Sequence, residues 1–294
     1  MVVGLDLTPL GMRLVALERS SAAATCVNAV HLALPQGAVN GLVLEGFDTV
    51  VDVLAEQVDA LGLVGCPVAM ALPSHGVREL SWPAWDGEPQ LWDETHVYKH
   101  VQQHMQLPQE AWSIDFGLEH EAPVQQAWAV VARESVVQER YELAEQAGLQ
   151  PKVLDVDRLA LDRLLDVACQ ESKVWPSVWL AWREGVLSAH VALAPSVVLS
   201  RSAYFWQGDT VVSQLQQLLS SALEGCDTSL MLQGPVSVRF TGLHELRVPL
   251  MEALQVQWRQ AFELPTPCAA WLEAVDTSQP YAVALGLALH PGLV

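Results

Sequence analysis

The first residues of the chain show the apolar runs and turn residues of a β-hairpin. Residues 2–7 and 12–17 are mainly apolar, and Thr8-Pro9-Leu10-Gly11 separates them. Because proline and glycine favour turns between strands, this pattern predicts two antiparallel strands. A further apolar stretch at 25–34 ends at Pro35-Gln36-Gly37 and predicts a third strand.

The spacing of apolar positions then changes to that of a helix. Asp48 is a residue type favoured at the N-cap, and Gly62 stands where such a helix would end. Between them the apolar residues recur at helical spacing: Val50, Val51, Leu54, Val58 and Leu61. The short apolar run at 67–72 predicts a buried strand that ends at Pro73.

The pattern from Ser74 onward is that of a smaller unit with its own strands and helices. We expect strands at 77–82, 112–118 and 126–132, and helices at 93–105 and 135–147. A strand at 153–156 and a helix at 158–169 follow. We interpret residues from about 74 to 155 as an inserted α+β module within a first lobe that covers residues 1–170.

The second half repeats the order of elements of the first. We expect strands at 178–182, 186–193, 196–202 and 236–241, and helices at 209–223, 248–262 and 282–289. A hairpin, a third strand, a helix and a further strand thus occur twice, which is a duplication of element order and not of residues. This predicts an α/β protein with a second lobe at residues 171–294.

Composition and charge narrow the functional classes. The 294 residues are 51% hydrophobic, which is ample for a large core, and carry a net charge of −19. Because phosphate contacts require clustered Lys and Arg, direct binding to nucleic acid or to an anionic membrane is disfavoured. A basic protein partner remains compatible with this charge.

Cysteine use and hydropathy point to the cytosol. The five cysteines are odd in number and form no C-x-x-C pair, which argues against a disulfide framework and a zinc ribbon. No signal peptide is visible at Met1, and no apolar run reaches the ~18 residues of a membrane span. We therefore expect a soluble cytoplasmic protein that reaches the membrane only through a partner.

Three histidines lie at helical spacing within the expected helix 93–105. His96, His100 and His104 could share a metal ion, since histidines four residues apart can do so. Val97 and Val101 carry the apolar face instead, and no Glu follows His96 as in H-E-x-x-H. A solvated helix face is the favoured interpretation, and no metal site is predicted.

Two further groups have both a functional and a structural interpretation. Trp82, Trp85 and Trp92 could anchor a protein contact, although core packing explains most tryptophans. Asp155 and Asp157 could be a catalytic pair, but Asp157 precedes a helix and is better explained as its cap. No nucleophile elbow, P-loop or dinucleotide fingerprint occurs.

Several stretches of the sequence carry a resemblance to a known family. The most specific combines Ala132-Arg133-Glu134 with Ala147-Gly148-Leu149-Gln150-Pro151 and Val153-Leu154-Asp155-Val156-Asp157. The others are residues 4–7, 13–15, 34–39, 68–73 and 284–289. Together they resemble the PilM family of type IV pilus assembly proteins, relatives of the cell-division protein FtsA. The resemblance covers about residues 2–170 and is weaker from 178 onward.

The resemblance implies a two-lobed actin-like (ribonuclease H-like) fold with a cleft for ATP. It also implies a groove beside the inserted module that takes the cytoplasmic tail of a PilN-like inner-membrane protein. In that family the protein builds a ring or platform on the cytoplasmic side, and related members serve DNA uptake in competence. Self-association is compatible with such a platform.

The nucleotide-binding positions carried over from the family are Asp6, Thr8, Arg13, Thr241 and Gly242. Thr8-Pro9 stands where the family has a small pair, and proline has no N–H to offer a phosphate. Arg13 replaces a lysine, and the strand 179–182 lacks the Asp-x-Gly of the second phosphate loop. The stretch 208–233 is short for the family, so a subdomain of the second lobe is expected to be trimmed. We interpret the nucleotide site as vestigial, without ATP, magnesium or ATPase activity.

Two functions of different classes remain. The first is a scaffold of a type IV pilus or DNA-uptake machine, and the alternative is an actin-like ATPase that cycles or polymerises. The missing carboxylate in strand 179–182 favours the scaffold. The expected walls of its peptide groove are Leu80, Trp82, Tyr98, Val101, Ile114 and Phe116.

Overall fold

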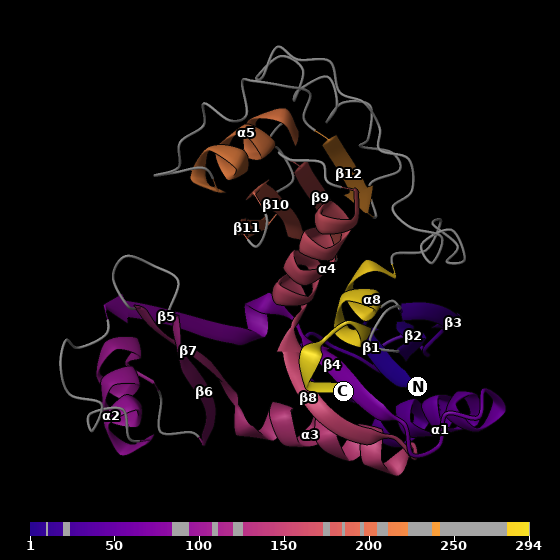
Figure 1. Ribbon diagram of the computed structural model, residues 1–294. Coiled ribbons are helices and arrows are strands. Elements are labelled where there is room, and N and C mark those ends of the chain that lie inside the picture. Colours follow the sequence, from indigo (N-terminus) through magenta and orange to yellow (C-terminus); the bar gives the residue numbers. More distant parts are fainter. Residues whose placement is uncertain are drawn as a thin grey trace.

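The computed structural model shows, in its described residues, two larger sheets and a three-stranded one, with helices between and around them (Figure 1). It describes residues 1–9, 11–19, 24–83, 94–107, 111–119, 126–172, 177–183, 186–194, 197–204, 211–222, 237–241 and 281–293. The described elements are mixed α and β, as the sequence predicts.

The first sheet has the order β3-β2-β1-β4-β8. Its strands are β1 (Val2–Thr8), β2 (Gly11–Arg19), β3 (Ala24–Leu32), β4 (Pro67–Leu72) and β8 (Gln150–Val156). The β1–β2 hairpin is antiparallel and β3 continues it, whereas β4 and β8 run parallel to β1. The predicted opening hairpin and third strand are confirmed.

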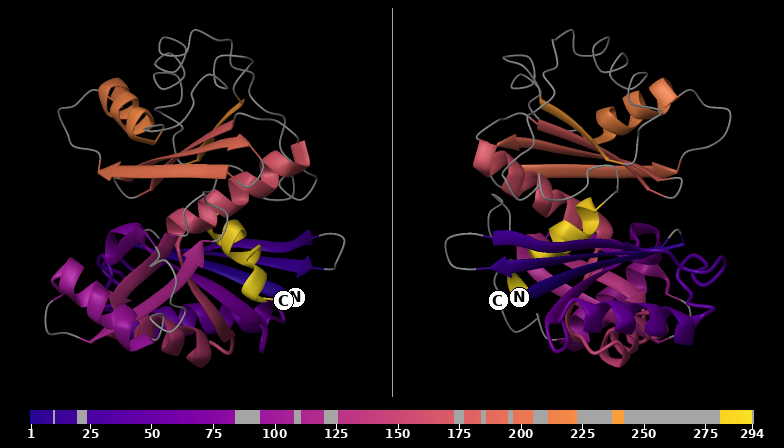
Figure 2. Two further views of the ribbon diagram at one scale, coloured as in Figure 1. Left: turned by 60° about the vertical axis from the view of Figure 1, so that its left-hand side comes forward. Right: turned by 90° about the vertical axis from the view of Figure 1, so that its right-hand side faces the viewer.

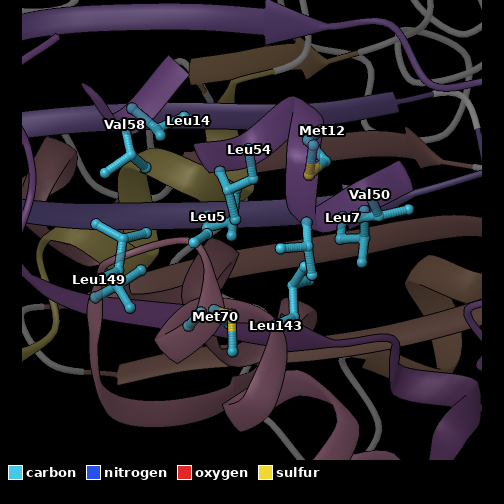
Figure 3. Packing of buried hydrophobic residues seen from close by; sticks show 14 of the residues in the cluster. Leu5, Leu7, Met12, Leu14, Val50, Leu54, Val58, Met70, Leu143 and Leu149 are labelled. Carbon is cyan, nitrogen blue, oxygen red and sulfur yellow. The ribbon is translucent and has the colours of Figure 1, made fainter. Parts of the chain in front are cut away.

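One face of this sheet packs against α1 (Phe47–Ala60) and α3 (Glu134–Gln146). Alternate residues of β1 and β2 meet the apolar side of α1, where Leu54 and Val58 are fully buried (Figure 3). The predicted N-cap of α1 is wrong: Gly46 occupies the N-cap position, and Asp48 is the second residue of the helix. Gly148 adopts a φ of 85° just after α3, a conformation that favours glycine at a helix end.

The opposite face packs against α4 (Asp157–Ser172) and α8 (Ala282–Ala288), which lie between the two sheets (Figure 2). Backbones approach closely here. A Cβ on Gly4 would lie 1.8 Å from the carbonyl oxygen of Ala284, and one on Gly286 would lie 2.0 Å from that of Ala160. Only glycine permits these two contacts.

In the described residues of the expected module, 74–155, three strands form a separate sheet with its own helix, whereas α3 and β8 of the same stretch belong to the layers of the first sheet. The separate sheet has the order β5-β7-β6 and consists of β5 (Val77–Pro83), β6 (Trp112–Glu119) and β7 (Gln126–Arg133). The helix α2 (Glu94–Met105) covers one face, and the short helix η1 (Ser74–Gly76) links β4 to β5. These elements agree with the prediction to within about two residues at each end.

The second sheet has the order β11-β10-β9-β12. Its strands are β9 (Ser177–Arg183), β10 (Val186–Ala194), β11 (Val197–Tyr204) and β12 (Ser237–Thr241), and the helix α5 (Val211–Ala222) contacts β10 and β11. Strands β11, β10, β9 and β12 repeat the directions of β3, β2, β1 and β4. The duplication of element order is therefore real.

Two predictions from the sequence do not correspond to a described element or boundary. The expected helix 248–262 lies outside the described residues. The expected lobe boundary at residue 170 falls within α4, and α4 contacts strands of both sheets. The chain ends in the short helix η4 (Pro291–Leu293), which packs on β8 and β4.

Candidate functional site

Three of the predicted nucleotide-site residues lie together on the face of the first sheet that packs against α8. Asp6 and Arg13 are directly opposite each other in the β1–β2 hairpin, and Thr8 is two residues further along β1. Arg13 Nη1 lies 3.4 Å from Asp6 Oδ2 and 3.4 Å from Thr8 Oγ1. All three side chains are almost completely buried.

The polar groups of this cluster are engaged with one another. The Thr8 hydroxyl donates a hydrogen bond to the Gly11 carbonyl oxygen at 3.1 Å, across the turn of the hairpin. The Asp6 carboxylate forms an ion pair with the Arg13 guanidinium. A phosphate or magnesium ion would have to compete with these contacts. The cluster therefore does not fit a magnesium nucleotide without rearrangement.

The other predicted nucleotide residues belong to the second sheet. Thr241 is the last residue of β12, which runs parallel to β9, and Gly242 lies outside the described residues. In β9 the residue at the position of Asp6, counted from the turn of the hairpin, is Ala181, which offers no carboxylate to magnesium. The structure thus brings Asp6, Thr8 and Arg13 together in the first sheet and places Thr241 on a strand of the second.

His31 extends the Asp6–Arg13 row onto β3, a position that sequence reasoning missed. It lies opposite Arg13 in the β2–β3 pairing. Within the described residues, neither His31 Nε2 nor Arg13 Nε has a hydrogen-bond partner, although both atoms are buried. The signal was available, since the register of three consecutive strands decides which residues share a row.

A second polar cluster joins the module, α4 and the second sheet. Arg158 binds Glu79 on β5 and Ser200 on β11, and Asp162 binds His190 on β10 through Oδ1 at 2.6 Å. His190 is fully buried, and its Nε2 lies 3.0 Å from Ser188 Oγ. Only the Arg158–Asp162 spacing of four residues was visible in the sequence.

The aspartates at the end of β8 have structural partners. Asp155 forms an ion pair with Arg163 at 2.8 Å. The carboxylate of Asp157, the first residue of α4, accepts hydrogen bonds from the backbone N–H of Ser74 at 2.9 Å and from the Ser74 hydroxyl. Asp157 therefore ties α4 to the start of the module, a contact that the predicted capping role did not include.

The six predicted groove residues lie where the module's sheet meets α2: Leu80, Trp82, Ile114 and Phe116 belong to the sheet, and Tyr98 and Val101 belong to α2. Val101 is fully buried and Trp82 is 8% exposed, while the other residues pack around them or support α2: Leu80, Tyr98, Ile114 and Phe116. Tyr98 donates from its hydroxyl to the Trp112 carbonyl oxygen at 2.8 Å. In this conformation Val101 and Trp82 belong to the buried core of the module.

The face of the module's sheet opposite α2, called the outer face below, carries the residues Glu79, Ser81, Trp128, Asp115 and Gly117. Trp128 is 37% exposed and lies over Gly117, where a Cβ would approach its Cζ2 to 2.6 Å. Glu79 and Asp115, both exposed, stand on either side of Val130 in the next row of the sheet. Sequence reasoning missed Trp128, although it alternates with the buried Ala127 and Ala129.

The histidines of α2 form a stack and not a chelate. The His100 ring lies 4.6 Å from that of Trp82 and 4.0 Å from that of His104, measured between centroids. His96 is exposed. Burial, with a smaller effect from His104, lowers the pKa of His100. In the described part of the chain, no three His, Cys, Asp or Glu residues are placed to hold a metal ion.

Two other observations bear on the predicted sites and on the membrane. Trp85 and Trp92 lie outside the described residues, so of the three tryptophans named together only Trp82 has a described environment. None of the described helices has the length and apolar character that crossing a bilayer requires.

Comparisons with known proteins place the fold and the family. The chain aligns along its full length with a solved PilM–PilN type IV pilus biogenesis complex, covering 98% of that chain at 19% identity with a TM-score of 0.68. A Bacteroides thetaiotaomicron protein with an actin-like ATPase fold and unknown function is 10% identical, with 92% and 93% of the two chains covered and a TM-score of 0.51.

The cytoplasmic domain of EpsL, an inner-membrane component of the type II secretion system of Vibrio cholerae, is 10% identical, with 92% of each chain covered and a TM-score of 0.50. No curated protein matches the sequence. These likenesses confirm the predicted actin-like fold. The family model "Type IV pilus assembly protein PilM" matches residues 4–172, which is more than half of the 294 residues. The chain belongs to the PilM family of type IV pilus assembly proteins.

Proposed function

We propose that this chain is a cytoplasmic scaffold of a type IV pilus machine, and that it binds the cytoplasmic tail of a PilN-like inner-membrane protein on the outer face of its module. The observation that carries the proposal is Trp128, half-exposed and flanked in the next row by Glu79 and Asp115. A similar solved structure is described as a PilM–PilN complex, which supports a partner of this kind.

The chemistry of the outer face fits a basic, partly apolar peptide. Tryptophan supplies a large contact area at little cost in side-chain entropy, and such residues often dominate binding energy. Glu79 and Asp115 offer two carboxylates to Lys or Arg, and Glu79 already binds a guanidinium, that of Arg158. The net charge of −19 adds long-range attraction for such a peptide.

The Asp6–Arg13 pair supports a scaffold over the alternative actin-like ATPase. Arg13 occupies the carboxylate that would face a magnesium nucleotide, and β9 contributes no carboxylate of its own. The scaffold therefore needs no nucleotide and performs no ATP turnover. It touches the membrane and any DNA only through partners, in pilus assembly or in DNA uptake, and its platform is built by self-association.

A binding measurement with the tail tests this function. The probe is a fluorescent synthetic peptide of the cytoplasmic segment of the PilN-type protein from the same organism. Trp128→Ala is expected to weaken binding by about tenfold or more, the size of an interface hot spot. Binding is also expected to weaken with rising salt.

Val64→Ala is the matched control, because Val64 is 63% exposed and lies in the turn between α1 and β4, away from the module. It is expected to bind like the parent chain. Equal loss in both variants, or no binding by the parent, would show that the outer face is not the docking site.

A further inference from the structure

Arg158, in the first turn of α4, connects three parts of the molecule. Its Nη2 lies 2.7 Å from Glu79 Oε1 on β5 of the module. Its Nη1 lies 2.7 Å from Ser200 Oγ on β11 of the second sheet and 3.2 Å from Asp162 Oδ2 on α4 itself. A single guanidinium thus ties the module to the second sheet.

The two ends of this guanidinium lie in different surroundings. Asp162 also accepts from Ser200 at 2.9 Å and binds the fully buried His190, so the Nη1 end is held in a closed network. The Nη2 end meets Glu79, whose side chain is 43% exposed. Burial alone would lower the pKa of Arg158, but the hydrogen bond to Glu79 and the charges of Glu79, Asp162 and Asp157 outweigh it and raise that pKa.

Glu79 has a second role if the proposed function holds, because it belongs to the outer face that would receive the tail. Resting on that function, we propose that Arg158 is a displaceable latch: a Lys or Arg side chain of the bound tail takes over Glu79, and the module is released from β11. The tail would thereby signal its presence to the second sheet without touching it.

The exchange is physically cheap. One cation replaces another at a carboxylate that is partly in water, where ion pairs contribute little. Arg158 keeps Asp162 and Ser200 after release, so it is not left buried without a partner. By contrast, removing Asp162 from the closed network would cost His190 and Ser200 one hydrogen bond each, and would leave His190 only Ser188 and Ser200 only Arg158 among the contacts described here.

The latch makes a prediction that a static ion pair does not. Arg158→Met removes the competitor for Glu79, so the tail peptide is expected to bind about two- to fivefold more tightly, the size of an exposed ion pair expressed as a binding constant. In the Glu79→Gln background the same change is expected to give no gain.

Asp115→Asn is the matched control, because Asp115 shares the outer face but none of the contacts of Arg158 described above. It is expected to weaken tail binding and still permit the gain from Arg158→Met. Hydrogen exchange provides the second readout: the tail is expected to speed exchange in β11 of the parent, and to change nothing further in Arg158→Met.

The outcomes separate the two proposals. If the parent chain does not bind the tail, the proposed function fails and the latch with it. If the tail binds but Arg158→Met binds equally or more weakly, or gains in the Glu79→Gln background too, the latch is wrong and the docking site stands. If Arg158→Met does not fold, Arg158→Lys replaces it, since Lys keeps the charge but lacks the two separate nitrogens through which Arg158 binds Glu79 and Ser200.

Discussion

The β1–β2 and β9–β10 hairpins have the same geometry but different chemistry. In the first, Thr8 pairs with Gly11 at the turn and Asp6 pairs with Arg13 two residues away. In the second, Arg183 pairs with Val186 at the turn, so the matching pair is Ala181 and Ser188. The duplication keeps strand order and register, while the ionic row occurs only in the first hairpin.

This difference shows that the repeated architecture does not depend on the ionic row. The sheets need alternating apolar residues and a fixed register, and the second hairpin keeps the register without an ion pair at the matching position. The carboxylate that contacts the second hairpin comes from another element: Asp162 of α4 binds His190 on β10. That carboxylate serves the contact between α4 and the second sheet.

The largest expected effect comes from breaking the first hairpin's ion pair. Arg13→Met leaves Asp6 as a buried carboxylate without its cation, which costs about 3–5 kcal/mol of unfolding free energy. Urea denaturation measures this. Asp6→Asn together with Arg13→Met is the control and should recover most of the loss. A cost of Arg13→Met below about 1 kcal/mol would mean that the pair is not held in a buried environment.

The matching position in the second hairpin should respond far less. Ser188→Ala removes a neutral hydroxyl that hydrogen-bonds His190 Nε2, and a typical neutral hydrogen bond contributes about 1 kcal/mol. The same denaturation series compares the two hairpins directly. If Ser188→Ala were as costly as Arg13→Met, the two hairpins would not differ in the way described here.

Mild acid should destabilise the module before it destabilises either hairpin. The pKa of His100 is lower in the folded protein than in the unfolded chain, chiefly because of burial and secondarily because of His104. The unfolded chain therefore binds more protons, and stability falls as the pH decreases through 6.5 toward the folded pKa. Hydrogen exchange in α2 should rise first, and His100→Gln should remove that rise; exchange in β1 rising equally early would contradict it.

The smallest expected effect is that of nucleotide. With ATP and magnesium the melting temperature should not change, because Asp6 is paired with Arg13 and strand β9 of the second hairpin offers no carboxylate. A ligand at a hundred times its dissociation constant would add about 2.7 kcal/mol. A clear upward shift that Asp6→Ala abolishes would restore the ATP-binding alternative.

Much of the fold could be predicted because it is encoded locally. Strand and helix spacing located the described elements, and a hairpin closed by Thr8 and Gly11 fixes Asp6 opposite Arg13. The Arg158 network could not be predicted, since Glu79, His190 and Ser200 come from three strands of two sheets. Trp82 and Trp128 are the same residue type, each on a strand of the module. Only the alternation along β5 and β7 decides which of them faces α2.

The glycines around α8 have a mechanical consequence. Gly4 and Gly286 let the backbone of α8 touch β1 on one side and α4 on the other, with no side chain between them. Interlocked side chains must change rotamers before two elements can slide, whereas smooth backbone surfaces need no such change. At these two contacts a small shift of α8 along β1 or α4 would therefore meet no interlocked side chain. An alanine in place of Gly4 or Gly286 would clash with the backbone of the facing element and prevent this close approach.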